Sequence, residues 1–192
     1  MQNAKDLRII KTHMALCGAF LELMNAKSFD NITVSELCEK SMVRRATFYK
    51  HFNDKYDFFR FFITEMHKQL EEENPEELKN VSPYDYLIIM TERFIYFLDD
   101  NEKMIKHILE SNLMPTLLDI LGEEFMKNFK RIHAPHKDIP EEMIAVMAAF
   151  YTGGIMQTIR WWLSNKNSIS KEQLIAICKN RLETIKQTSF LL

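Results

Sequence analysis

Hydrophobic residues recur at every third or fourth position over most of the chain, the spacing that places them on one face of an α-helix. The first segment of this kind has its apolar residues at Leu7, Ile10, Met14, Cys17, Leu21 and Met24. They predict a helix of about five turns that ends near Asn25 and turns this stripe inward. Only four Gly and five Pro interrupt the 192 residues, so the pattern favours an all-α protein over a β-sandwich.

Capping residues and prolines divide the chain into nine predicted helices. Thr33 with Glu36, and Ser170 with Gln173, match the capping box that opens a helix. Three further helices begin at or next to a proline, which is favoured at the first helical position. After the first helix, the predicted segments are 34–40, 44–52, from 53 or 54 to about 73, 83–98, from 99 or 100 to 110, 115–132, 140–163 and 170–188.

The composition indicates a hydrophobic core and a reducing compartment. A chain with 46% hydrophobic residues can bury the core of one domain, or of a small module and a larger one. Its cysteines, Cys17, Cys38 and Cys178, lie on apolar helical faces without metal-ligand spacing, so they are expected to be core residues in a reducing compartment. No leader pattern and no apolar run of roughly 18 to 20 residues is present. We therefore expect a soluble, cytoplasmic protein without a membrane segment.

Charge is unevenly distributed along the chain. Residues 1–60 contain ten basic and seven acidic residues, a net charge of +3, whereas the remainder contains fifteen basic and twenty acidic residues, a net charge of −5. A basic end on an acidic body indicates that one end of the protein meets a polyanion and the other does not.

The basic end contains two short predicted helices joined by a tight break, with a longer helix before them. This is the helix-turn-helix arrangement, whose second helix enters the major groove of DNA. Arg45 and Lys50 would present donors that can reach guanine, while Thr47, Tyr49 and His51 are suited to phosphate oxygens. The alternative is a charged, solvated helix pair. An exposed Tyr49 among Lys and His residues favours DNA binding over that alternative.

The stretch "ITVSELCEKSMVRRATFYKHFNDKYDFF", residues 32–59, resembles the DNA-binding signature of the TetR family of bacterial transcription regulators. In that signature a recognition helix of the form T-[LF]-Y-x-[HY]-F precedes a Lys at the next helix start. The match covers about the first 60 residues. The resemblance implies base-edge contacts by Ser35, Arg45, Ala46 and Lys50, and phosphate contacts by Thr33, Thr47, Tyr49, His51 and Lys55.

Two positions depart from the family pattern. Met42 stands where the turn usually has Gly, so it must adopt a backbone conformation that Gly takes without steric cost. Arg44 stands where a Ser-like cap is usual and cannot cap the helix with a side-chain oxygen. Arg44 is instead a further candidate for a phosphate contact.

The rest of the chain resembles the family's variable regulatory domain. "FYTGGIMQTIRWWLSNKNSISKEQL" is similar to a branch that includes conventional repressors and partner-dependent regulators of dihydroxyacetone metabolism. The expected domains are a DNA-binding domain over residues 1–53 and a regulatory and dimerisation domain over 54–192. Small residues on the eighth helix and an apolar stripe on the ninth favour a homodimer through these two helices; alternatively, both faces pack in their own core. They are Ala145, Ala148, Ala149, Gly153 and Gly154, and Leu174, Ile177, Cys178, Leu182 and Ile185.

The resemblance also implies an effector cavity in the helical body, for a small hydrophobic or amphipathic molecule and without a cofactor. Large, adaptable side chains are the candidate lining, although such residues are more often core. They are Phe62, Met66, Phe94, Phe97, Met104, Leu117, Met147, Tyr151 and Trp161.

The resemblance implies a DNA-binding repressor that leaves a pseudo-palindromic, double-stranded operator when an effector binds. One alternative is a regulator of the same type controlled by a protein partner. The other is a metal-dependent enzyme with ligands at His133, His136 and Asp138. No Gly-rich phosphate loop, nucleophile elbow or HExxH motif is present, so an enzyme and a metal site are not expected.

Overall fold

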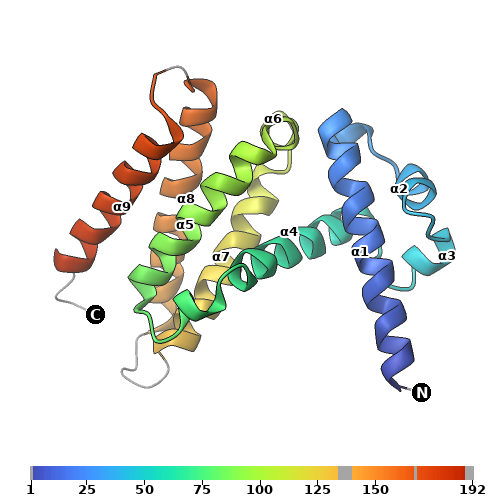
Figure 1. The fold of residues 1–192 in the computed structure, drawn as a ribbon, viewed down its shortest axis with the longest axis horizontal. Helices are drawn as coiled ribbons and strands as arrows, with labels where there is room; N and C mark the ends of the chain where they lie inside the picture. Colours follow the sequence, from blue (N-terminus) through green and yellow to red (C-terminus); the bar gives the residue numbers. More distant parts are fainter. Residues whose placement is uncertain (1, 134–139, 167, 189–192) are drawn as a thin grey trace. The chain divides into compact units, whose positions relative to one another are not determined.

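The computed structural model describes residues 2–133, 140–166 and 168–188. These residues form nine α-helices and two short 3-10 helices, without a strand (Figure 1), which confirms the predicted all-α class. In chain order the elements are α1 (Gln2–Ala26), η1 (Phe29–Asn31), α2 (Val34–Lys40), α3 (Arg45–Phe48), α4 (Lys55–Glu72), η2 (Pro75–Leu78), α5 (Pro83–Asp100), α6 (Glu102–Leu109), α7 (Met114–His133), α8 (Glu141–Ser164) and α9 (Lys171–Thr188).

Two predicted boundaries were wrong. The third helix was expected to reach residue 52 but is α-helical only to Phe48, because the amides of Lys50 and His51 bond carbonyls three residues back and form a tighter turn. The sixth helix was expected to begin at Asp99 or Asp100. Its N-cap is Asn101, because α5 continues to Asp100.

The chain forms two compact units. The first contains the residues up to Ile63 and Asn101–Met114, and the second contains Thr64–Asp100 and the residues from Pro115 onward. The predicted boundary between residues 53 and 54, which separates a DNA-binding domain from a regulatory domain, stays a prediction. The structural division instead falls within α4.

An aromatic core holds the first unit together. Phe20 of α1 lies among Phe29, Phe58, Phe59 and Phe62, with ring centroids 4.9–6.3 Å apart. All five side chains are buried, and edge-on ring contacts stabilise such a cluster beyond the burial of area alone. The core therefore fixes α1, η1 and the first half of α4 as one body.

The buried face of α1 differs from the predicted stripe. Of the predicted residues, Met24 is buried, but Leu7, Ile10 and Met14 are more than half exposed. The aromatic core instead contacts the face of α1 that carries Leu16 and Phe20. The helix was predicted correctly, and its orientation was wrong because tertiary packing selects one of its two apolar faces.

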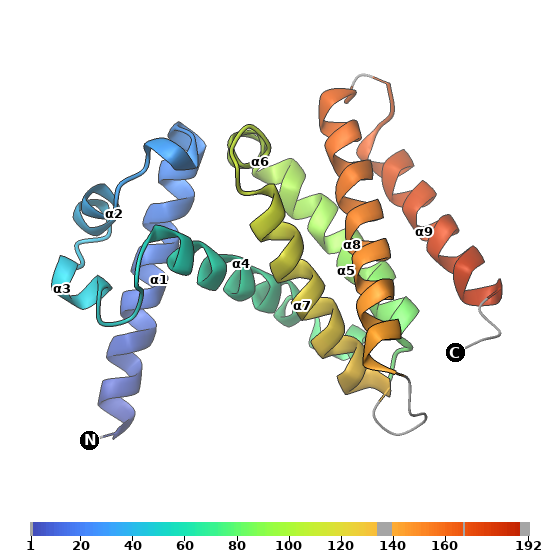
Figure 2. The same cartoon turned by 180° about the vertical axis from the view of Figure 1, so that it is seen from behind.

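The second unit contains α5, α7, α8 and α9 with the end of α4, and α8 and α9 lie side by side in both ribbon views (Figure 2). Charged contacts tie α9 to α5. Lys186 lies 2.7 Å from Asp85, and Lys179 pairs with Glu92. None of the described helices is long and apolar enough to cross a membrane.

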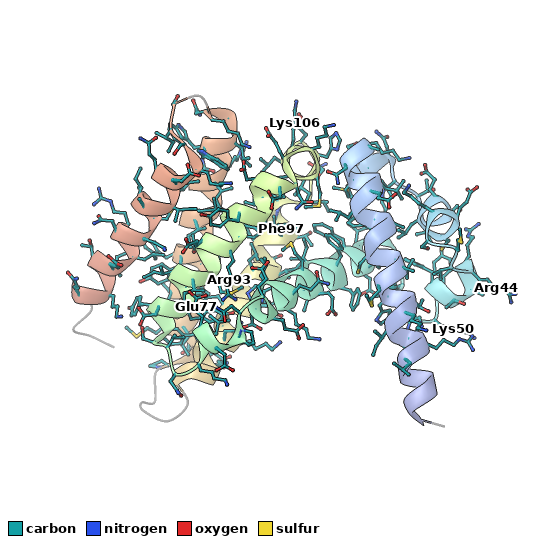
Figure 3. The ribbon with its side chains drawn as sticks, in the orientation of Figure 1. Arg44, Lys50, Glu77, Arg93, Phe97 and Lys106 are labelled. Atoms are coloured by element: carbon teal, nitrogen blue, oxygen red, sulfur yellow. The ribbon has the colours of Figure 1, made fainter. Side chains whose placement is uncertain are left out.

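Arg93 of α5 caps the C-terminal end of α4. Its buried guanidinium donates to the carbonyl oxygens of Leu70 and Asn74 at 2.6 and 3.0 Å, and it forms an ion pair with Glu77 at 2.6 Å (Figure 3). The last carbonyls of a helix have no partner within the helix. Arg93 therefore satisfies this helix end and the connector that follows it.

Candidate nucleic-acid interface

The capping box predicted for α2 is present. The Thr33 hydroxyl accepts a hydrogen bond from the Glu36 amide at 3.2 Å, and the Glu36 carboxylate accepts one from the Thr33 amide at 3.3 Å. Lys27 forms an ion pair with Glu36, and its hydrogen bond, followed by that from the Thr33 backbone, lowers the pKa of Glu36. Thr33, predicted to contact phosphate, thus has a structural role at the start of α2.

The turn after α2 has the left-handed conformation that the sequence required. Met42 has φ 56°. Its amide donates to the Glu39 carbonyl at 3.1 Å, and the Val43 amide donates to the Cys38 carbonyl at 3.0 Å. These two bonds form the Schellman motif, in which Gly is the usual residue at the position of Met42. The Met42 side chain is 95% exposed.

The structure brings most of the predicted DNA-contacting residues together on α2, α3 and the turn after α3. Arg44 is the N-cap of α3 and makes no side-chain cap bond, as predicted. Figure 3 shows the side chains of Arg44 and Lys50 extending away from α3. Seven of the ten predicted residues are exposed, namely Thr33, Ser35, Arg44, Arg45, Ala46, Tyr49 and Lys50, and Thr47, His51 and Lys55 are half-buried.

Buried aromatic residues position this surface. Phe48 and Phe52 are buried at either end of the turn, and the Tyr49 ring stands edge-on to Phe48 at 5.4 Å. The His51 ring packs against His13 of α1, with centroids 5.0 Å apart. This contact between His51 and α1 had no signal in the sequence, because it joins residues distant in the chain.

Lys55 does not point toward solvent as the other predicted cations do. Its ammonium donates to the carbonyl oxygens of Phe29, Asp30 and Ile32. The start of α4 is also occupied by a carboxylate, because Asp54 accepts hydrogen bonds from the amides of Tyr56 and Asp57 at 2.8 Å. The Lys55 ammonium and the amides of Tyr56 and Asp57 thus have partners within the protein, and the phosphate contact implied for Lys55 stays a prediction.

A cavity of about 80 Å³ lies in the second unit, between the end of α4 and helices α5, α7 and α8. Of the nine predicted lining residues, it contains Met66 and Phe94. The complete lining is Met66, His67, Leu70, Tyr86, Leu87, Met90, Thr91, Phe94, Leu121, Phe125, Thr152, Ile155 and Met156.

The other seven predicted lining residues lie elsewhere. Phe62 and Met104 are buried in the first unit, and Leu117 is buried in the second. Phe97 packs on the cluster of Leu70, Tyr86 and Met90. Met147 and Tyr151 belong to the cluster of Leu87, Ile88 and Leu182. Trp161 is 48% exposed. Apolar spacing alone could not separate core residues from cavity residues.

Polar groups lie along one edge of this apolar cavity. The Tyr86 hydroxyl donates to Glu71 at 2.7 Å and lies 3.4 Å from Nε2 of His67. The Thr91 and Thr152 side chains are also part of the lining. An apolar cavity with a few polar groups is typical of a small-molecule site.

An exposed apolar stripe runs along α8. Met143, Val146, Phe150 and Trp161 are 42–69% exposed. Gly154 lies between them, and a side chain there would meet no atom within 4 Å. By contrast, most of the predicted α9 stripe, including Leu174, Cys178 and Leu182, is buried within its own unit, whereas Ile177 is 48% exposed.

The described side chains include no group of three His, Cys, Asp or Glu residues that could hold a metal ion. The candidate ligands His136 and Asp138 lie outside the described residues, as does the side chain of His133. Burial raises the pKa of the Cys38 and Cys178 thiols, so these cysteines are unreactive core residues.

Two family models match the chain. The model for bacterial regulatory proteins of the tetR family matches residues 19–60, the segment that contains the helix-turn-helix. The model for the transcriptional regulator C-terminal region called TetR_C_8 matches residues 85–184, just over half of the chain. The chain belongs to the TetR family. It is therefore a DNA-binding transcriptional regulator.

One relative by sequence and two solved structures are similar to this chain. The uncharacterized HTH-type transcriptional regulator YxbF of Bacillus subtilis (strain 168) is 39% identical over 59 residues, which are 30% of this chain and only 16% of that protein. A TetR-family regulator from Syntrophomonas wolfei is similar in fold, with a TM-score of 0.64, 18% identity, and coverage of 94% of this chain and 97% of that one. The dihydroxyacetone kinase operon activator DhaS gives a TM-score of 0.59, 18% identity, and coverage of 90% and 94%.

Proposed function

We propose that this TetR-family regulator is a cytoplasmic repressor that binds a pseudo-palindromic operator as a homodimer and leaves it when a small effector binds. In this proposal residues 1–53 bind DNA, and residues 54–192 dimerise and bind the effector. The observation that carries it is the exposed surface of Arg44, Arg45, Tyr49 and Lys50 on a segment held by buried aromatic residues. Fixed, exposed donors on a short helix match major-groove recognition.

The exposed residues divide into two proposed roles. Arg45 and Lys50 read base edges, with Ser35 and Ala46 beside them, because long cationic side chains reach guanine O6 and N7. Arg44, Thr47, Tyr49 and His51 hold phosphates. The Thr33 hydroxyl and amide both donate to Glu36, so Thr33 is left out of this set. Phosphate contacts release counterions, so affinity should fall steeply as salt rises.

The proposed effector is a small, mostly apolar molecule with one hydrogen-bonding group. The apolar lining of the cavity and its polar edge at His67 and Tyr86 support this class. A cavity of about 150 Å³ holds benzene, whereas this cavity has about 80 Å³, so an effector of that size or larger must displace side chains. Copurification of a protein partner, with no small molecule changing DNA release, would favour partner control instead.

Selection of preferred sites from random DNA tests the proposal. Arg45→Ala or Lys50→Ala should each cost about 1–3 kcal/mol on the preferred site and relax discrimination at one position per half-site. Binding to random DNA should fall less. Arg44→Ala is the matched control, because a phosphate contact carries no sequence information. If only Arg44→Ala changes the selected sequence, the assignment of roles on this segment is wrong.

A further inference from the structure

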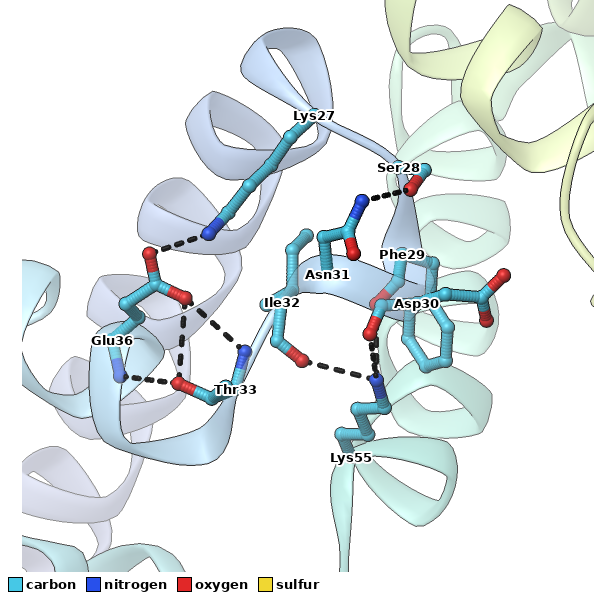
Figure 4. A network of polar contacts seen from close by, with 9 residues as sticks. All are labelled: Lys27, Ser28, Phe29, Asp30, Asn31, Ile32, Thr33, Glu36 and Lys55. Carbon is cyan, nitrogen blue, oxygen red and sulfur yellow. Dashed lines mark hydrogen bonds and ion pairs between the residues drawn. The ribbon is translucent and has the colours of Figure 1, made fainter.

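Lys55, the first residue of α4, binds the connector between α1 and α2. Its Nζ donates to the carbonyl oxygens of Phe29, Asp30 and Ile32 at 3.0, 3.1 and 3.0 Å. Figure 4 shows these bonds converging on one ammonium. The same nitrogen lies 4.6 Å from the centroid of the buried Phe29 ring, so a cation–π contact adds to the three hydrogen bonds.

These contacts use the full donor capacity of the side chain. A lysine ammonium has three N–H groups and no acceptor, and three carbonyls already receive them. A phosphate could be bound only if one of these carbonyls lost its partner. The Asp54 and Asp57 carboxylates at the same helix end further disfavour an anion there, because like charges repel.

The three bonds close a loop that contains the helix-turn-helix. The bonded residues are 23 to 26 positions apart in the chain, and α2, the Met42 turn and α3 all lie between them. The connector is also held at its other end, where Lys27 pairs with Glu36 of α2 (Figure 4). The bonds of Lys55 and the Lys27–Glu36 ion pair together restrict how α3 can tilt against α1 and α4.

We propose that Lys55 is a positioning residue. Its three bonds to Phe29, Asp30 and Ile32 form a clamp that holds the recognition segment in its DNA-binding orientation, and Lys55 does not touch DNA. This inference rests on the proposed DNA binding. It assigns to Lys55 a role opposite to the phosphate contact implied by sequence, because the ammonium acts within the protein. Its loss should lower the fraction of the protein with α3 in the binding orientation, and so weaken binding to all DNA sequences by the same factor while the bound state keeps its phosphate contacts.

Lys55→Arg and Lys55→Met separate the two roles. Arginine keeps the charge and binds phosphates well, but its planar fork cannot converge on three carbonyls as an ammonium does. A phosphate contact therefore predicts wild-type affinity for Lys55→Arg. The clamp predicts that both variants lose affinity, by roughly tenfold, the size of one charge-assisted hydrogen bond. Binding would be followed by fluorescence anisotropy over a salt series on one random duplex and on the selected site.

The slope of log affinity against log salt distinguishes a lost phosphate contact from a lost clamp. Loss of a phosphate contact lowers this slope by about 1, whereas loss of the clamp leaves it at the wild-type value. Hydrogen exchange on the free variants should be faster in α2 and α3, with no change in α9. Preserved affinity of Lys55→Arg, a lower slope for Lys55→Met, or wild-type affinity with only reduced stability would each overturn the inference. If wild-type protein binds no DNA, the proposed function fails, while exchange in the free protein still tests the clamp.

Discussion

Met42 combines a left-handed backbone with a side chain that contacts almost nothing. A non-glycine residue in this region costs about 1 kcal/mol relative to Gly, and the 95% exposed side chain recovers little of that by packing. The turn is nevertheless fixed, because two hydrogen bonds of the Schellman motif and the buried Leu37 and Phe48 on either side hold it. The surrounding structure therefore imposes the conformation on Met42.

We expect Met42→Gly to stabilise the protein by about 0.5–1 kcal/mol, because it removes this strain and deletes no buried contact. Met42→Ala is the control, since alanine keeps the steric cost of a positive φ. The midpoints of urea unfolding would be compared for the three proteins. Equal stability of the Gly and Ala variants would show that the turn is unstrained.

At the scale of elements, one aspartate anchors the connector between α8 and α9. Asp99, near the end of α5, accepts hydrogen bonds from Lys171 at 2.8 Å and from Lys166 at 2.9 Å. Trp162 adds a bond from its indole N–H to the Ile169 carbonyl at 3.2 Å. Bonds from Lys171, then Lys166, lower the pKa of Asp99. The start of α9 is therefore placed by charge as well as by its apolar face.

This anchor predicts a loss of stability in acid. Because the folded pKa of Asp99 lies below the unfolded value of about 3.9, its contribution is complete above that pH and disappears as pH falls through the folded pKa. Asp99→Asn should lower the free energy of unfolding by about 1 kcal/mol at pH 7. This difference from wild type should be smaller at pH 3. Asp100→Asn, at the exposed neighbour, should show neither effect. A gap that is the same at both pH values would contradict this, as measured by urea unfolding.

Helices were predictable from the sequence because their start signals are local. Thr33 with Glu36 and Ser170 with Gln173 each place a hydroxyl and a carboxylate or amide within one turn, so no distant contact is needed. The buried face of α1 was not predictable, since apolar residues occur on both of its sides and the aromatic core selects one. The role of Lys55 was hidden for the same reason, because its three acceptors lie on a connector more than twenty residues earlier.

At the scale of the whole molecule, the α8 stripe is the surface that we assign to the homodimer. Phe150 and Val146 are 68% and 69% exposed, and the neighbouring Gly154 leaves room for a partner helix to approach closely. Trp161, predicted from sequence to line the effector cavity, extends this stripe instead. Small residues on α8 led the sequence to predict this helix as part of the dimer interface, and that stays a prediction. The large apolar side chains between them gave no signal of which way they face.

Phe150→Asp should dissociate the proposed dimer, because a carboxylate would be buried without a partner. We expect a loss of at least about 2 kcal/mol, roughly thirtyfold in the dimer Kd, measured by analytical ultracentrifugation. Met14→Asp is a matched control, since Met14 is also 68% exposed but lies on α1. Equal effects of the two substitutions, or none from Phe150→Asp, would place the interface elsewhere.

The cavity in the second unit has three methionines in its lining, Met66, Met90 and Met156. Unbranched thioethers change rotamer at little cost and reshape the space that they enclose. A homologous series of effectors that differ by one methylene should therefore give nearly equal dose–response curves. Changes to the polar group beside His67 and Tyr86 should alter the response much more, because an unpaired polar group in an apolar cavity is costly. The regulator would then be selective for a functional group and tolerant of chain length.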